Sequence, residues 1–204
     1  ANPECAVTHG STYENRQNVA EAWLNQIVRK YEGTTLGRQE LHAEVLNEMP
    51  GALWTRTNLK ETRIKVAPEL TRIVVAIDPA ATSKAGSDDT GIVVAGIDLR
   101  GHGYVLEDLT CHTSPNRWAE IAVSAYHRWN ADRIIAEINN GGEMVESTLR
   151  TVDRNVAYLG IHASKGKQAR AEPVAALYEQ NRVHHVGLYA DMEDELCGWA
   201  PNQN

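Results

Sequence analysis

Two short apolar runs, each ending in an acidic residue, constrain the fold of this chain more than any other feature. The first spans residues 72–79 (RIVVAIDP) and the second spans residues 133–142 (RIIAEINNGG). The apolar part of the first run shows no alternation, which predicts a central strand covered on both faces. Pro79 cannot donate a ladder hydrogen bond, so we expect this strand to end near Asp78.

The acidic residues at these two strand ends, Asp78 and Glu137, predict a metal site. A carboxylate at the end of a buried strand is costly unless it is paired, and two like charges on neighbouring strands need a cation between them. Hard carboxylate oxygens suit Mg²⁺ or Mn²⁺. Two such ions about 4 Å apart would activate a water and stabilise the leaving oxygen of a phosphodiester displacement. Taken singly, Asp78 is also an ordinary turn starter and Glu137 a surface charge.

The compact part of the chain predicts the order β-β-β-α-β-α-β-α from about residue 71. We expect strands at 72–77, 91–98, 103–111, 133–137 and about 155–160, helices after 115, after 142 and at about 170–180, a short extended piece at 182–186 and helical turns at 191–199. This pattern predicts an α/β fold with a mixed five-stranded sheet in the order 3-2-1-4-5, flanked by helices. Sequence order reverses between the first and fourth strands, which places a crevice at the ends that carry both acids.

Three further residues near the predicted crevice are candidates for ligand binding. Asp88 precedes the second strand and is expected to be an outer metal ligand, although Asp-Asp-Thr-Gly is also an ordinary turn. Asn139 and Asn140, followed by two glycines, would suit a backbone phosphate at a helix N-terminus. A plain strand-to-helix turn explains the two asparagines equally well.

A basic stretch predicts where nucleic acid would bind. The chain has a net charge of −7, which argues against a free-standing nucleic-acid binder. Residues 161–185 nevertheless carry four basic and two acidic residues. Lys165, Lys167 and Arg170 surround the start of a predicted helix and are expected to follow a DNA backbone; a solvated helix face is the simpler alternative. We expect His162, His184 and His185 to be structural.

The first sixty residues predict a helical extension. Residues 11–14 offer a capping-box pattern before an apolar stripe that ends near residue 31. A second amphipathic segment is expected at 38–48, and both helices would pack on another domain. Residues 53–70 are expected to form an irregular connection. No apolar run approaches the roughly 18 residues of a membrane span, and three widely spaced cysteines fit a reducing compartment.

Several stretches, taken in order, resemble one known family. VVAIDPAAT, DDTGIVVAGID, IIAEINNGGEMV and KGKQARAEPVAALYEQNRVHHVG are similar to the C-terminal nuclease domain of tailed-phage terminase large subunits. This match covers most of residues 71–200. VTHGSTYEN, YEGTTLGRQELHAEVL and GALW resemble the end of the ATPase domain and the linker of the same proteins.

The resemblance implies an RNase H-like endonuclease that cuts concatemeric double-stranded viral DNA. The first and second acids of the family match Asp78 and Glu137. The third lies in a DAxVWA-type helix expected beyond residue 204, so we expect residues 71–204 to be the nuclease domain without its C-terminal helix. Residues 1–70 would be the end of the ATPase domain and the linker. An acid of the last helical turns could replace the missing third ligand only by swinging in, whereas we expect these acids on a solvated face: Asp191, Glu193, Asp194 and Glu195.

The resemblance also implies partners and a location. The implied partners are the terminase small subunit and the portal protein, and no membrane is implied. The implied location is the host cell cytoplasm, with transient residence at the procapsid portal. No GxxxxGK[ST] motif occurs in the chain, so we do not expect it to hydrolyse ATP as it stands.

Two other functions compete with the nuclease hypothesis. One is a non-catalytic docking module of the packaging motor. The other is an actin- or sugar-kinase-like ATP-binding domain, which shares the β-β-β-α-β-α order. Such domains hold phosphate with a glycine-rich turn after the first strand, whereas here no glycine occurs between that strand and Gly86.

Overall fold

A computed structural model of the chain describes residues 11–13, 16–21, 23–25, 28, 41, 49, 51–79, 89–138 and 142–201. The two helices expected in the first fifty residues therefore lie mostly outside the described residues, apart from short pieces such as the 3-10 helix Arg16–Asn18. The chain forms two compact units, one of residues 57–189 and one of residues 1–56 with 190–204. No helix within the described ranges is long and apolar enough to cross a membrane.

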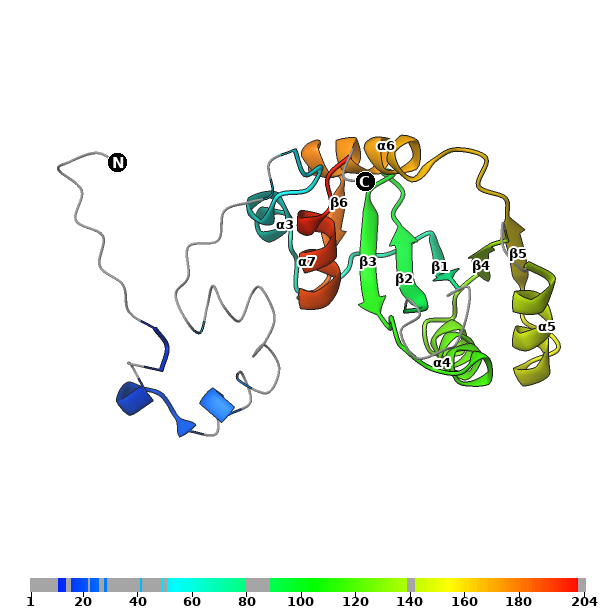
Figure 1. The fold of residues 1–204 in the computed structure, drawn as a ribbon, viewed down its shortest axis with the longest axis horizontal. Coiled ribbons are helices and arrows are strands. Elements are labelled where there is room, and N and C mark those ends of the chain that lie inside the picture. Colours follow the sequence, from blue (N-terminus) through cyan, green and yellow to red (C-terminus); the bar gives the residue numbers. More distant parts are fainter. Residues whose placement is uncertain are drawn as a thin grey trace. The chain divides into compact units, whose positions relative to one another are not determined.

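The larger unit is built on a six-stranded mixed sheet (Figure 1). Its strands are β1 (Arg72–Asp78), β2 (Gly91–Ile97), β3 (Gly103–Asp108), β4 (Arg133–Glu137), β5 (Tyr158–Ile161) and β6 (Val183–His185). The strand order is β5-β4-β1-β2-β3-β6. β2 is antiparallel to β1 and β3, while β4, β5 and β6 run parallel to their neighbours. The expected order of five strands is confirmed, and the extended piece near residue 183 adds a sixth strand beside β3.

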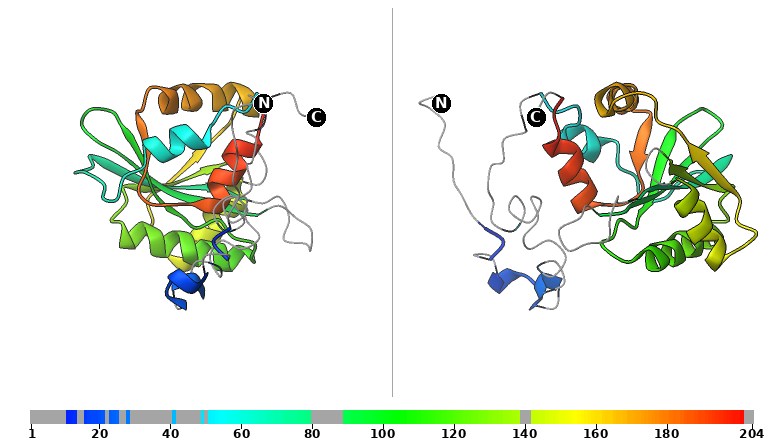
Figure 2. Two further views of the ribbon diagram at one scale, coloured as in Figure 1. Left: turned by 90° about the vertical axis from the view of Figure 1, so that its left-hand side faces the viewer. Right: turned by 45° about the vertical axis from the view of Figure 1, so that its right-hand side comes forward.

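Helices cover the two faces of the sheet unequally. These helices are α4 (Pro115–Arg128), α5 (Gly142–Val152) and α6 (Lys167–Glu179). In both views of Figure 2, α4 and α5 lie on one side of the sheet and α6 on the other. The main hydrophobic core lies between the sheet and the first two helices. It includes Val75, Ile77, Ile134, Ala136, Trp118, Ala122 and Leu149.

The opposite face of β1 is open, and the expectation that β1 is covered on both faces is wrong. Val75 and Ile77 point into the core, but Ala76 and Asp78 are exposed. The reason is the position of α6, which contacts β6 at the far edge of the sheet. A run of apolar residues cannot distinguish a strand covered on both faces from one that leaves small side chains exposed.

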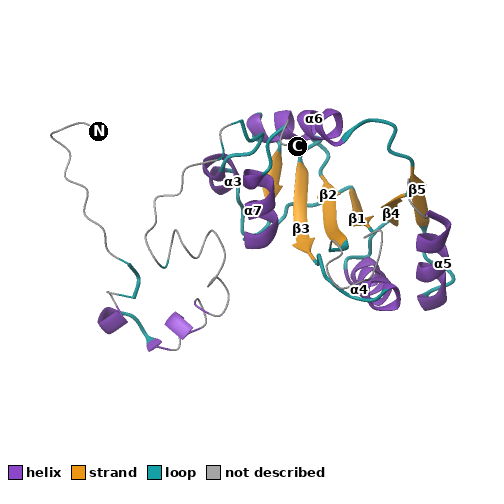
Figure 3. Ribbon diagram, in the orientation of Figure 1, coloured by secondary structure: helices purple, strands orange, loops and turns teal. Residues whose placement is uncertain are grey.

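Two further helices lie before and after the strands in the sequence (Figure 3): α3 (Arg56–Glu61) precedes β1, and α7 (Ala190–Gly198) follows β6. The expected irregular connection at residues 53–70 is therefore wrong in part. α3 is held by Leu59, which is fully buried, and by Asn58, whose side-chain amide donates to the carbonyl of Tyr178 at 3.0 Å. Six residues are too few for a helical period to be visible in the sequence.

Candidate active site

Asp78 and Glu137 occupy equivalent positions at the ends of two neighbouring parallel strands. The register pairs Ile77 of β1 with Ala136 of β4, so the next residue on each strand is one of the two acids. Successive side chains of a strand point to opposite faces. Because Ile77 and Ala136 are buried, both carboxylates belong to the open face of the sheet. The structure thus brings these two residues together as expected, and their chemical role remains a prediction.

Nearby charges act on the carboxyl group of Asp78. The pKa of Asp78 is raised above its ordinary value of 3.8, first because the surrounding protein removes water from the carboxyl group and second because Glu137 repels its charged form. Arg170 and Lys167 act in the opposite direction and lower this pKa. Four charged groups of opposite signs therefore share one small region at the end of β1.

An ion pair joins helix α6 to this region. A guanidinium nitrogen of Arg170 donates to Oε2 of Glu137 at 2.7 Å. The Glu137 side chain is 27% exposed and that of Arg170 is 45% exposed. Arg170 belongs to the first turn of α6, three residues after Lys167. The sequence indicated Arg170 as a DNA contact but gave no sign of this ion pair, because its two partners lie 33 residues apart.

A pocket of about 370 Å³ adjoins Glu137 on this side of the sheet. Its floor is formed by strand residues of β1 and β4, and its wall by the connection between β5 and α6 together with Arg170. The lining residues are Ala76, Ile77, Ile135, Ala136, Glu137, Ile161, His162, Ala163, Ser164, Lys165 and Arg170. His162, expected to be structural, is thus an exposed part of the pocket wall, and the predicted DNA contacts Lys165 and Arg170 lie in the same wall.

Three of the predicted site residues, Asp88, Asn139 and Asn140, lie outside the described residues. Asp89, which follows Asp88 in the chain, has a carboxylate oxygen 3.3 Å from Nδ1 of His112. This exposed contact follows from the bridge between Thr90 and Cys111, which lies just beyond the pairing of Asp78 with Gly91. The sequence showed no signal for it.

The other two histidines that were expected to be structural, His184 and His185, contact neighbouring segments of the larger unit. The Nε2 atom of His184 in β6 lies 3.0 Å from Nδ1 of His102. The Nδ1 atom of His184 lies 2.9 Å from the carbonyl oxygen of Thr62. His185 is buried, and its Nε2 atom lies 2.9 Å from the hydroxyl of Tyr178. Both residues tie β6 to neighbouring segments.

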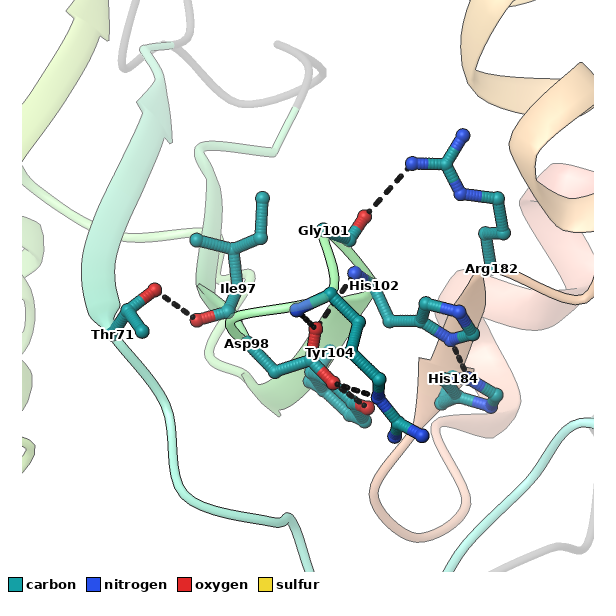
Figure 4. A network of polar contacts seen from close by, with 9 residues as sticks. Thr71, Ile97, Asp98, Gly101, His102, Tyr104, Arg182 and His184 are labelled. Carbon is teal, nitrogen blue, oxygen red and sulfur yellow. Dashed lines mark hydrogen bonds and ion pairs between the residues drawn. The ribbon is translucent and has the colours of Figure 1, made fainter.

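A buried carboxylate that the sequence analysis missed organises the β2–β3 hairpin (Figure 4). Asp98 accepts hydrogen bonds from the backbone N–H groups of Arg100 and His102, each at 2.9 Å, and from the hydroxyl of Tyr104 at 3.0 Å. Gly101 has a φ of +79°, which favours glycine in this turn. β2 and β1 are antiparallel, so the hairpin lies at the opposite end of the sheet from Asp78.

The acids of α7 do not all lie on a solvated face, and that expectation is wrong for two of them. Glu193 is only 4% exposed. Asp194 accepts from a guanidinium nitrogen of Arg56 at 2.6 Å, with both side chains about one-fifth exposed (21% for Arg56 and 19% for Asp194). Arg56 precedes Asp194 by 138 residues, so a helical pattern alone could not reveal the pairing. Asp191 and Glu195 are exposed as expected.

The donor atoms at the end of β1 and β4 fit a hard divalent cation. Within the ranges that the structure describes, no three His, Cys, Asp or Glu side chains come together closely enough to hold a metal ion. The two adjacent carboxylates suit Mg²⁺ or Mn²⁺, which need few protein ligands and complete their shells with water and phosphate oxygens. Such a cation would relieve the repulsion that Glu137 exerts on the charged form of Asp78.

The fold defines the class of protein. Three antiparallel strands followed by parallel β-α-β units, with acids at the ends of β1 and β4, form an RNase H-like sheet. The family model for the terminase RNase H-like domain matches residues 75–197. The chain therefore belongs to this family, and the resemblance seen in the sequence is confirmed. Membership favours the nuclease hypothesis over the kinase-like alternative.

Solved structures share this fold at low sequence identity. The large terminase of a thermophilic bacteriophage, solved in complex with ADP, is 14% identical with a TM-score of 0.58; the match covers 95% of this chain and 47% of that one. The large terminase nuclease of the thermophilic phage G20c is 13% identical with a TM-score of 0.51, over 72% of this chain and 80% of that one. The chain thus spans about half the length of the ADP-bound large terminase. No curated protein sequence matches it.

Proposed function

We propose that the chain contains the endonuclease domain of a viral DNA-packaging terminase, which cleaves concatemeric double-stranded DNA with the help of Mg²⁺ or Mn²⁺. The observation that supports this most directly is the pair of carboxylates, Asp78 and Glu137, beside a pocket with a basic wall. The similarity to the G20c protein, which is described as a nuclease, agrees with it. Residues 71–204 would form this domain, and residues 1–70 would be the end of an ATPase domain and the linker.

Asp78 and Glu137 are the residues that would hold the metal. When bound, two such ions would activate a water and stabilise the leaving oxygen of the phosphodiester. The protein contributes position, because both carboxylates stand on strand ends one register step beyond Ile77 and Ala136. Asp88 is proposed as an outer ligand, with Asn139 and Asn140 as donors to a backbone phosphate.

The basic wall of the pocket would bind the DNA backbone. Lys165, Lys167 and Arg170 are exposed, and they lie on the connection before α6 and in its first turn. Cationic side chains at this place would attract phosphates and release counterions on binding. A phosphodiester drawn to this wall would lie next to Glu137, which shares the pocket with Lys165 and Arg170.

The partners and location follow from the same proposal. The full-length protein would meet the terminase small subunit and the portal protein in the cytoplasm of the host cell, and the DNA would be the viral concatemer. These assignments concern the whole protein, of which this chain represents a part in comparison with the ADP-bound large terminase.

Nicking of supercoiled plasmid in the presence of Mn²⁺ tests the proposed function. We expect cleavage that EDTA abolishes and that Asp78→Asn reduces by roughly 100-fold or more, because the substitution removes a metal-binding charge with little change in volume. Asp191→Asn is the matched control, since Asp191 is an exposed carboxylate on α7, and it should cleave like the wild type. An active Asp78→Asn protein would contradict the metal assignment. A folded chain that binds its partners but never cleaves would favour the docking-module alternative.

A further inference from the structure

We propose that Arg170 is an internal counter-ion of Glu137 that competes with the metal and is released toward a DNA phosphate when the metal binds. The inference rests on the proposed function and adds to it a residue that couples the metal site to the DNA site.

The contact between the two residues is direct and charged. A guanidinium nitrogen of Arg170 lies 2.7 Å from Oε2 of Glu137, within the short range of charge-assisted hydrogen bonds. The carboxylate oxygen that would bind a cation is thus engaged by a cation that belongs to the chain. A divalent ion that approaches this oxygen must share it with the guanidinium or displace it.

The charges near the end of β1 balance in this arrangement. Asp78 and Glu137 contribute two negative charges, and Arg170 and Lys167 contribute two positive charges that act on Asp78. A divalent ion between the carboxylates would add two positive charges at this place. Repulsion between this ion and the nearby guanidinium then favours departure of the guanidinium from Glu137. Arg170 is also the more exposed partner of the pair, at 45%, so its side chain has room to move.

The pocket offers a destination for the released side chain. Arg170 lines the same wall as Lys165 and Ser164, and its backbone is held in the first turn of α6. Because Glu137 lines the same pocket, only side-chain rotation is needed to turn the guanidinium from Glu137 toward a phosphate bound there. Arginine binds phosphate oxygens with two parallel hydrogen bonds. A phosphodiester in the pocket would thus bind the Arg170 guanidinium that the metal displaces from Glu137.

Mn²⁺ binding in the absence of DNA tests this competition. Free Mn²⁺ would be measured by electron paramagnetic resonance during titration of the wild-type chain, Arg170→Gln, Arg170→Lys and Arg154→Gln. We expect Arg170→Gln to bind Mn²⁺ roughly 10-fold more tightly, on the order of the effect of removing one nearby competing charge. Arg170→Lys keeps the positive charge near Glu137 and should bind Mn²⁺ less tightly than Arg170→Gln.

Arg154→Gln is the matched control, because it makes the same change in net charge at an exposed site. Arg154 lies between α5 and the start of β5, at the opposite end of the parallel strands from Glu137. Its Mn²⁺ affinity should stay within about 2-fold of the wild type, since distant exposed charges are screened. Circular dichroism of each variant would show that the fold is retained.

The outcomes separate this inference from the proposed function. Wild-type protein that binds Mn²⁺ and nicks plasmid, together with an Arg170→Gln affinity that is unchanged or weaker, would overturn the counter-ion role alone. An Arg170→Lys protein that binds as tightly as Arg170→Gln would overturn it as well. If no variant binds Mn²⁺ and the wild type does not nick plasmid, the proposed function and the inference both fail.

Discussion

Asp78 illustrates how a proposed metal ligand can lower the stability of the fold that holds it. Its carboxylate loses hydration at the end of β1 and faces Glu137, and both effects raise its pKa. A charged form that the native state disfavours reduces the stability of that state. Such groups are common at catalytic sites, where a ligand supplies the missing stabilisation.

The difference in stability between Asp78→Asn and the wild type should therefore depend on pH in a defined direction. The folded protein binds the Asp78 proton more tightly than the unfolded chain, so stability is lost as the pH rises from the ordinary value of 3.8 through the raised pKa. Without metal at pH 7, we expect Asp78→Asn to be more stable than the wild type by less than about 1 kcal/mol, because the side chain is exposed. Urea unfolding would show this gain shrinking toward pH 3.8, and a variant that is less stable at pH 7 would contradict it.

The pKa of Asp98 is shifted in the opposite direction to that of Asp78. Burial alone would raise its pKa, but hydrogen bonds from the His102 backbone, the Tyr104 hydroxyl and Arg100 together lower it to about 2. The stability that this carboxylate provides is present above the ordinary value of 3.8 and is lost as the pH falls from 3.8 through about 2.

Asp98→Asn should consequently destabilise the protein most at neutral pH. The amide nitrogen of asparagine would face the donors Tyr104 and Arg100 in place of an acceptor oxygen. We expect a clear drop in the urea midpoint at pH 7 and a smaller one at pH 3, with Asp191→Asn as an exposed control. A midpoint difference that does not depend on pH would argue against ionisation of Asp98 as the cause.

Helix α6 combines a structural and a proposed functional role. Its C-terminal half is anchored by Tyr178, which is buried against His185. Its first turn projects Lys167 and Arg170 toward the carboxylates of the sheet. The helix thus sets the distance between the proposed DNA-binding wall and the proposed metal site.

Loss of the two lysines near the start of α6 should weaken DNA binding independently of sequence. Because each phosphate contact releases counterions, we expect Lys165→Ala with Lys167→Ala to lower affinity several-fold and to reduce the slope of log K against log salt by about 1 to 2. Fluorescence anisotropy with duplex DNA at several salt concentrations would measure both. Lys60→Ala with Lys65→Ala is a control pair on exposed positions outside the pocket lining. An unchanged slope would place the DNA path elsewhere.

On the face opposite the main core, the sheet is open near the end of β1, where two strand ends and one helix start converge. A helix or ribbon suited to insertion into a DNA groove is not seen in the described part of the chain near this face. The contacts available there are carboxylates, cations and small apolar side chains. These are contacts to the backbone of DNA and not to the edges of its bases.

Cleavage should accordingly show little preference for sequence. We expect fragments from several plasmids to end at sites without a shared motif, because direct recognition requires side chains that reach base edges. Sequencing of the cleaved ends would measure this. A strong consensus at the cut sites would mean that other parts of the protein or its partners read the DNA.

Local patterns in the chain were enough to predict five strands, their order and the meeting of Asp78 with Glu137. Periodicity reports burial along one segment, and short connections leave few ways to pair consecutive strands. The open face of β1, the helix α3, the pairing of β6 with β3 and the ion pair between Arg170 and Glu137 were not predictable in this way. Each depends on which distant segments come into contact, and that is settled by packing and charge pairing across the folded chain.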